Sequence, residues 1–300
     1  MLQTEKLLWL VEIIYSYKKI TRSEIDNIYK IKFGKPLSRK TFNRWKDQAE
    51  ELFGINIKCE AKTYKYYIED IEKKDDIRKW ILDNMLTSTM FMNDTSLREK
   101  IISEEIPRGG EYMKTIIDAL KTNHILRVTH KDFTSEKEHV TDCMPLCLKL
   151  NKQRWYMLFQ YYNEGNLRRN IYSLDRILNI ETLEDTFVYP EDFEPSDFFK
   201  HLYGVFINHA EEEPPTVRIR TTRAFMKGLL RSLPLHHSQK EVEIVDENVS
   251  IFEYHLHPNK DFKIELFKNG CDLEVLEPAT LRDEIIDEIQ KMQNLYNETE

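Results

Sequence analysis

The first 70 residues show the apolar spacing of short helices. From Thr4 to about Lys18, apolar residues recur three and four positions apart, which predicts an amphipathic helix with this apolar face: Leu7, Leu8, Val11, Ile14 and Tyr15. Thr21 followed by Glu24 is a capping-box pattern and predicts the start of a second helix. Ser38 is a favoured N-cap residue for a third helix, which we expect to end at Gly54.

The third predicted helix carries an apolar stripe, for which we expect burial of Phe42, Trp45, Ala49 and Leu52. Residues 55–70 then alternate and are rich in aromatic and β-branched residues, which predicts a two-stranded hairpin whose turn, Glu60 to Thr63, contains no glycine. Three helices followed by a hairpin are the layout of a winged helix-turn-helix module. We therefore expect residues 1–70 to form such a DNA-binding domain.

Residues 71–123 have a helical pattern, and we expect them to form a connector or dimerisation segment. Its apolar residues could either pack against a second subunit or belong to an ordinary core: Trp80, Leu82, Met85, Leu86 and Met90.

From residue 124 to residue 190 the period becomes strand-like, with five short strands joined by tight connections, as in a small, strongly bent β-barrel. Residues 191–214 read as a linker with one short helix. Residues 215–300 mix strands and helices in an order that is ferredoxin-like in outline. The predicted fold class is therefore α+β.

The net charge is informative when it is calculated separately for different parts of the chain. The 300 residues hold 44 Lys and Arg against 52 Asp and Glu, a net charge of -8 that argues against a polyanion partner. Residues 1–70 carry a net charge of +4, however, and residues 71–300 a net charge of -12. The basic first quarter is therefore the part that we expect to face DNA.

The basic and polar residues of the third helix lie opposite its apolar stripe, where a recognition helix meets bases and phosphates. With two lysines of the hairpin, they make up the predicted DNA-binding set: Arg39, Lys40, Thr41, Asn43, Arg44, Lys62 and Lys65. A basic run is often only a solvated face. A winged helix used for protein contacts is therefore the alternative.

Other signals concern location and chemistry. No apolar run is long enough to span a membrane, and charged residues interrupt the N-terminal apolar stretch, so we expect a cytoplasmic protein with reduced cysteines and no membrane partner. The sequence has no phosphate-binding glycine loop, HExxH or nucleophile elbow. His255 and His257 lie two apart on one strand, but surface histidines explain them as well as a metal site does. We expect no catalytic residues, metal or cofactor.

The middle segment resembles a known family. Pro145, the run Arg154–Met157 and the run Arg169–Ile177 resemble the WYL domain, which is named for Trp-Tyr-Leu at the positions held here by Trp155, Tyr156 and Met157. Residues 270–278, followed by a helical pattern, look like the extension that usually follows this domain.

The resemblance implies a bacterial transcription regulator, usually a homodimer, with a winged helix, an Sm-like or SH3-like barrel and an α+β C-terminal domain. It also implies that the barrel senses a nucleic-acid or nucleotide effector. Carried over by position, the candidate effector-binding residues are His130, Tyr156, Arg169, Ser173 and Arg176. The sequence departs from the family at His130, where the family often has Tyr, and at Met157.

Strand alternation limits how these residues can combine. In a regular strand over residues 168–177, Arg169 and Ser173 share one face and Arg176 lies on the other. A bulge or turn must therefore separate the two arginines if both are to reach one site. The Asp175–Arg176 pair could mark that break, or it could form a structural ion pair.

The function predicted from the sequence is a transcriptional regulator that binds a double-stranded DNA operator and is modulated by a nucleic-acid or nucleotide effector. The alternatives are a nucleotide- or RNA-binding adaptor and a nucleic-acid-processing enzyme, neither of which would bind an operator.

Overall fold

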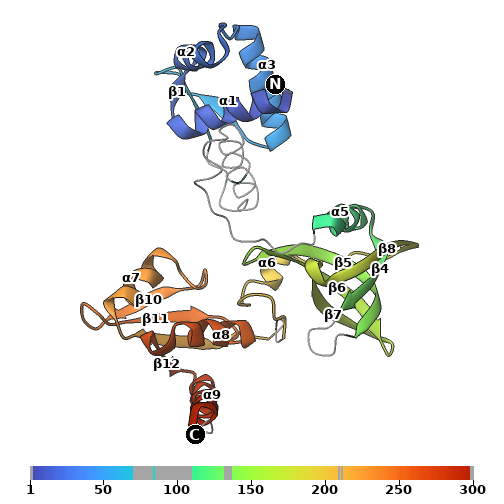
Figure 1. The fold of residues 1–300 in the computed structure, drawn as a ribbon, viewed down its shortest axis with the longest axis vertical. Helices are drawn as coiled ribbons and strands as arrows, with labels where there is room; N and C mark the ends of the chain where they lie inside the picture. The colour runs from blue at the N-terminus through green and yellow to red at the C-terminus, as the bar shows by residue number, and fades with distance from the viewer. Residues whose placement is uncertain are drawn as a thin grey trace. The chain divides into compact units, whose positions relative to one another are not determined.

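The chain divides into two compact units, residues 1–104 and residues 105–300, and each is described by itself. The computed structural model describes residues 3–69, 84, 110–131, 137–208, 210 and 212–297. Most of the predicted connector, including the stripe from Trp80 to Met90, lies outside the described residues. Figure 1 shows the first unit in blue, and the second runs from green to red.

The first unit contains three helices and a three-stranded antiparallel sheet of order β1-β3-β2 (Figure 1). Its elements are α1 (Gln3–Tyr17), β1 (Ile20–Thr21), α2 (Arg22–Phe33), α3 (Arg39–Phe53), β2 (Ile57–Cys59) and β3 (Lys65–Ile68). The predicted helix starts are confirmed. The Thr21 side chain accepts a hydrogen bond from the Glu24 N–H, and Glu24 Oε2 accepts one from the Thr21 N–H at 2.8 Å. Ser38 Oγ accepts one from the Thr41 N–H at 3.1 Å.

The core of this unit is aromatic. Trp9 packs edge-on against Tyr29 with ring centroids 5.3 Å apart, and Tyr29 packs in the same way against Trp45 at 5.7 Å. Phe42 and Ala49 are fully buried, as predicted, but the prediction for Leu52 was wrong because its side chain is 56% exposed. Leu52 lies in the last turn of α3, where other side chains, Phe53 and Ile55, fill that end of the core.

The β2–β3 hairpin turns without glycine because a tyrosine takes the left-handed conformation. Tyr64 has φ 54°, and its N–H donates to the Glu60 carbonyl at 2.8 Å. The Glu60 carboxylate also accepts a hydrogen bond from Lys19 Nζ at 2.8 Å, which ties the hairpin to the end of α1. The tip of the hairpin, with Lys62 and Tyr64, remains exposed.

The second unit begins with η2 (Gly110–Tyr112), α5 (Met113–Thr122) and an antiparallel sheet of order β7-β6-β5-β4-β8 (Figure 1). Its strands are β4 (His124–Lys131), β5 (Glu138–Asn151), β6 (Arg154–Asn163), β7 (Asn166–Ser173) and β8 (Ile177–Thr186). Ile116 and Ala119 of α5 belong to the core on one side of this sheet.

The five predicted strands are present, but the predicted closed barrel is not found. Within the described residues, β7 and β8 are the two edges of the sheet and do not pair. The short helix η3 (Leu174–Arg176) interrupts the extended chain between them, so that β8 pairs with β4 instead.

The rest of the unit forms a four-stranded antiparallel sheet of order β10-β11-β9-β12. Its elements are β9 (Thr216–Thr221), α7 (Ala224–Ser232), β10 (Lys240–Ile244), β11 (Ser250–His255), α8 (Lys260–Lys268), η4 (Gly270–Asp272), β12 (Leu273–Glu277) and α9 (Ala279–Asn297). The strands and α8 contribute the buried Phe252, Tyr254 and Phe262 to one core. The last helix, α9, runs away from the sheet (Figure 1).

Helix α8 was not predicted from the sequence. Asn259 caps this helix, since its side chain accepts a hydrogen bond from the Phe262 N–H at 3.1 Å. With α8 in place, the order from β9 to β12 is βαββαβ, the order of ferredoxin-like folds.

Replacing Ser38 with Ala should destabilise the first unit by about 1 kcal/mol, because the first turn of α3 loses its side-chain acceptor. Ser38→Asp retains an acceptor at the same position and should be close to the parent. Urea unfolding followed by tryptophan fluorescence measures the difference, since Trp9 and Trp45 are buried in this unit. Equal stability of Ser38→Ala and the parent would contradict the capping role.

Candidate functional site

The exposed side of α3 carries most of the predicted DNA-binding residues. Arg39, Lys40, Asn43 and Arg44 are exposed, and the part of the chain that the structure describes contains no salt bridge to the three cations. Thr41 differs from them, because its hydroxyl lies 2.8 Å from Ser38 Oγ in the cap of α3. The first two turns of α3 therefore present three cations and an amide to solvent.

The two hairpin lysines lie in different environments. Lys62 is exposed in the turn, whereas Lys65 is partly buried at the start of β3. Of these two lysines, Lys62 therefore has the side chain that is more accessible to a ligand.

In the second unit, the pairing of β6 with β7 decides which candidate residues meet. The register runs without a bulge from Tyr156 opposite Ser173 to Asn163 opposite Asn166, and it places Gln160 opposite Arg169. Side chains alternate between the two faces of a strand. Tyr156, Gln160, Arg169 and Ser173 therefore share one face, which we call the Arg169 face.

His130 lies against the other face of these strands. Its ring stacks on that of Tyr172 with centroids 4.0 Å apart and an interplanar angle of 5°. Tyr172 also packs against Phe159 of the core, and burial raises the pKa of its hydroxyl. The structure thus separates His130 from Arg169.

Arg176 ends the short helix η3, which provides the break that alternation required between Arg169 and Arg176. The neighbouring Asp175 forms a salt bridge with Arg154 at 3.2 Å. Because Arg154 begins β6, this pair holds η3 against the sheet.

The Arg169 face is covered by residues 187–206, which we call the strap. It carries the short helix α6 (Pro195–Phe198) and a row of aromatic rings: Phe187, Tyr189, Phe193, Phe198 and Phe199. The Arg169 guanidinium lies 5.4 Å from the ring centroid of Phe193 and 5.4 Å from that of Phe198. Cation–π attraction therefore contributes to holding the strap on the sheet.

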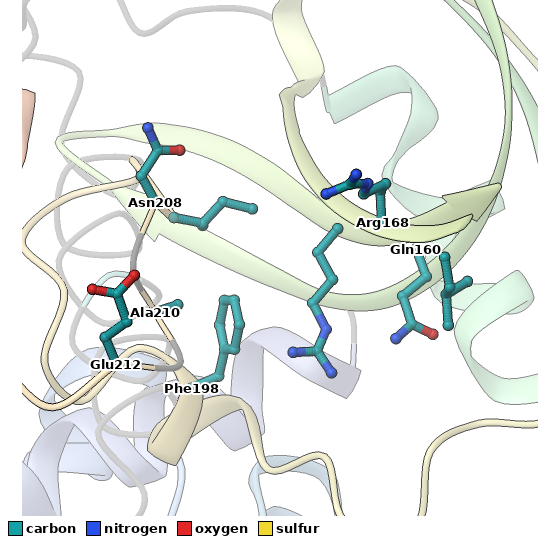
Figure 2. Close-up of a pocket in the computed structure, with 9 residues that line it drawn as sticks. Gln160, Arg168, Phe198, Asn208, Ala210 and Glu212 are labelled. Atoms are coloured by element: carbon teal, nitrogen blue, oxygen red, sulfur yellow. The ribbon is translucent and has the colours of Figure 1, made fainter. Parts of the chain in front are cut away.

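A pocket of about 460 Å³ opens beside Arg169. In Figure 2, Gln160 and Arg168 lie on the strands, while Phe198, Asn208 and Glu212 lie across the pocket. The full lining is Gln160, Leu167, Arg168, Arg169, Phe198, Ile207, Asn208, Ala210 and Glu212. Guanidinium groups bind phosphate, amides bind base edges and an aromatic ring stacks on bases. The lining therefore matches the chemistry of a nucleotide.

Sequence reasoning missed several residues of this site: Gln160, Arg168, Phe193, Phe198 and Asn208. The signal that could have found the strap is its composition. Five aromatic residues between positions 187 and 199 are too many for a solvated linker, which would gain nothing by exposing them.

Lys149 of β5 also holds the strap on the sheet, through Phe199 and Gly204. Lys149 Nζ donates a hydrogen bond to the Gly204 carbonyl at 2.6 Å and lies 3.8 Å from the ring centroid of Phe199. Burial lowers the pKa of Lys149 to about 8. At the other end of the strap, the Tyr189 hydroxyl donates to the Leu146 carbonyl at 2.9 Å.

The described residues contain no cluster of three or more His, Cys, Asp or Glu side chains that could hold a metal ion. His255 Nδ1 lies 3.4 Å from Thr216 Oγ1, and His257 Nε2 lies 3.1 Å from the Glu212 carbonyl oxygen. Among the same residues, no helix is both long enough and apolar enough to cross a membrane.

Residues 111–182 match the family model of the WYL domain. This match extends from η2 into β8 and so contains α5, the whole β6–β7 pair and the Arg169 side of the pocket. The strap lies beyond the matched residues. The WYL domain therefore supplies Gln160, Arg168 and Arg169, and the following segment supplies Phe198, Asn208 and Glu212.

Comparison with solved structures gives weaker likenesses. Proteasome accessory factor B/C (PafBC) of Arthrobacter aurescens is 16% identical with a TM-score of 0.35, and the match covers 96% of this chain but only 47% of that one. A CRISPR Cas-related protein is 13% identical with a TM-score of 0.40, and the match covers 88% of this chain and 75% of the other. No curated protein matches the sequence.

Replacing Gly204 with Ala should loosen the strap and cost about 2–3 kcal/mol of unfolding free energy. Gly204 has φ +70°, and an added Cβ would overlap the Asp261 carboxylate, which accepts a hydrogen bond from the Val205 N–H at 2.8 Å. Gly165→Ala is the matched control, because Gly165 has φ +79° with nothing within 4 Å of an added Cβ, and it should cost only about 1 kcal/mol. Equal losses in urea unfolding would show that the Asp261 contact is unimportant.

Proposed function

We propose that the protein is a DNA-binding transcriptional regulator in which residues 1–70 contact an operator and the WYL domain binds a nucleic-acid or nucleotide effector. The observation that carries the proposal is the row of Arg39, Lys40, Asn43 and Arg44 on the exposed side of α3. Such a row is what a recognition helix needs, since arginine and asparagine read base edges and lysine binds phosphate.

The order of elements supports a winged-helix interpretation of the first unit. Helix α1, strand β1, helices α2 and α3, and the β2–β3 hairpin follow one another, and β3 lies between β1 and β2. In this interpretation α3 enters the major groove, and the exposed hairpin tip with Lys62 lies near the flanking backbone. A homodimer would then present two copies of α3 to two half-sites, and the protein would act in the cytoplasm without catalysis.

The pocket beside Arg169 supports the effector part of the proposal. Arg169, with Arg168 next to it at the pocket edge, supplies charge for a phosphate, and Gln160 and Asn208 supply amides. Tyr156 and Ser173 lie on the same face further along the strands. His130 and Arg176 would act from outside this pocket, through Tyr172 and η3 respectively.

The alternatives differ in what they require of α3. An adaptor or a nucleic-acid-processing enzyme could use the pocket and leave α3 without a DNA partner. We favour the regulator because the exposed cations of α3 and the pocket beside Arg169 would then both bind nucleic acid or nucleotides.

Reversing three charges on α3 tests operator binding. Arg39→Glu, Lys40→Glu and Arg44→Glu together should weaken binding to genomic DNA fragments by more than about 100-fold at 0.1 M salt and reduce the salt slope by about three units. Fluorescence anisotropy against salt concentration measures both quantities.

The matched control reverses three exposed lysines of the second unit, Lys114, Lys121 and Lys240, and so changes net charge by the same amount. It should leave DNA binding within about threefold of the parent. If both triple variants bind as the parent does, α3 is not a recognition helix.

The effector part predicts that Arg168→Ala with Arg169→Ala weakens binding of single-stranded oligonucleotides or nucleotides by at least about tenfold, because each charge-assisted hydrogen bond is worth about 1.5–3 kcal/mol. Lys114→Ala with Lys121→Ala on α5 is the control and should bind like the parent. Isothermal titration calorimetry with a set of oligonucleotides and nucleotides measures the loss. An unchanged affinity in the arginine variant would place the effector elsewhere.

A further inference from the structure

The strap places aromatic rings and negative charges beside the candidate pocket. Phe193 and Phe198 already lie over the Arg169 guanidinium at 5.4 Å, in the place that a stacked base would take. Around these rings the strap exposes four carboxylates: Glu191, Asp192, Glu194 and Asp197. Aromatic rings set among negative charges are the chemical pattern of a single-stranded nucleic acid.

The strap is also bonded at its far end to the loop between β11 and α8. The His257 N–H donates to the His201 carbonyl at 2.8 Å, and Asn259 Nδ2 donates to the Tyr203 carbonyl at 2.8 Å. Leu202 is buried and forms a parallel bridge with His257. A shift of the strap therefore acts directly on the loop that leads into α8.

The middle of the strap is its weakest part. Regular structure there is limited to the four-residue helix α6, and its contacts with the WYL domain include the two rings beside Arg169 and the Lys149 anchor. Local opening starts where few buried contacts and short helices hold the chain. Residues 191–199 are therefore the part of the strap that we expect to leave the sheet first, before the bonds at its two ends.

We propose that the strap is an internal competitor of the effector: a single-stranded nucleic acid binds the Arg169 face by displacing Phe193 and Phe198, and the displaced strap changes the loop before α8. This inference rests on the proposed effector site. It adds that the unliganded protein is held closed by its own aromatic and acidic residues.

Removing the competitor should strengthen binding. With 5′-labelled dT10 as the probe and the full chain as the protein, Phe193→Ala with Phe198→Ala should bind about tenfold more tightly than the parent in fluorescence anisotropy. The matched control is Phe187→Ala, which removes a strap ring that packs against Tyr189. It should bind like the parent.

A second set of variants tests the charges. Glu191→Gln, Asp192→Asn and Asp197→Asn together should also tighten dT10 binding, with a gain that shrinks as salt rises. Glu181→Gln, Glu184→Gln and Asp185→Asn change three exposed carboxylates of β8 instead, and should give a smaller gain.

Hydrogen exchange on the parent protein tests the displacement without any substitution. Saturating dT10 should speed exchange of the Phe198 and Leu202 amides, whose N–H groups bond to Glu194 and Phe199 in the closed strap. The His257 amide, bonded to His201, should follow. Slower exchange in the strap on binding would overturn the proposal.

The outcomes separate the two levels of inference. If the parent binds dT10 and the Arg168/Arg169 variant does not, but removing Phe193 and Phe198 weakens binding, these rings belong to the binding surface and the competitor proposal is wrong while the effector site stands. If neither the parent nor any strap variant binds dT10 or a nucleotide, the effector site itself fails, and the competitor proposal fails with it.

Discussion

The uninterrupted register between β6 and β7 is the constraint on which the candidate site depends. Eight successive residue pairs, from Tyr156 with Ser173 to Asn163 with Asn166, fix which side chains share a face. A slip of one residue would move Arg169 into the core and Tyr172 out of it. Because Tyr172 is held in the core with Phe159, that slip would bury an unpaired charge, and the register is therefore strongly specified.

The same constraint explains why the strap lies where it does. The Arg169 face includes apolar side chains as well as the arginine, and Leu158 is fully buried there. Covering this face with the aromatic strap removes apolar surface from water and leaves the arginine against two neighbouring rings. A surface that can accept the chain's own aromatic rings can also accept bases. The contacts that stabilise the strap on the Arg169 face are therefore of the same kind as those that would bind a ligand there.

Local features of the fold could be predicted from the sequence, and non-local ones could not. The caps at Thr21 and Ser38 involve residues three apart, so their patterns are sufficient to place α2 and α3. The separation of His130 from Arg169 depends on how β4 and β7 lie in one sheet, which spacing does not encode. Helix α8 was missed because its charged sequence has a weak apolar stripe, and its cap at Asn259 follows a proline that resembles a turn.

Crosslinking of a single-stranded oligomer carrying 5-bromodeoxyuridine to the full chain, with the adducts located by mass spectrometry, tests the central claim most directly. A ligand on the Arg169 face should give adducts in the second unit within residues 156–173 or at the strap rings and residues 207–212. Adducts in the second unit that fall only beside His130, or the complete absence of adducts there, would contradict the account.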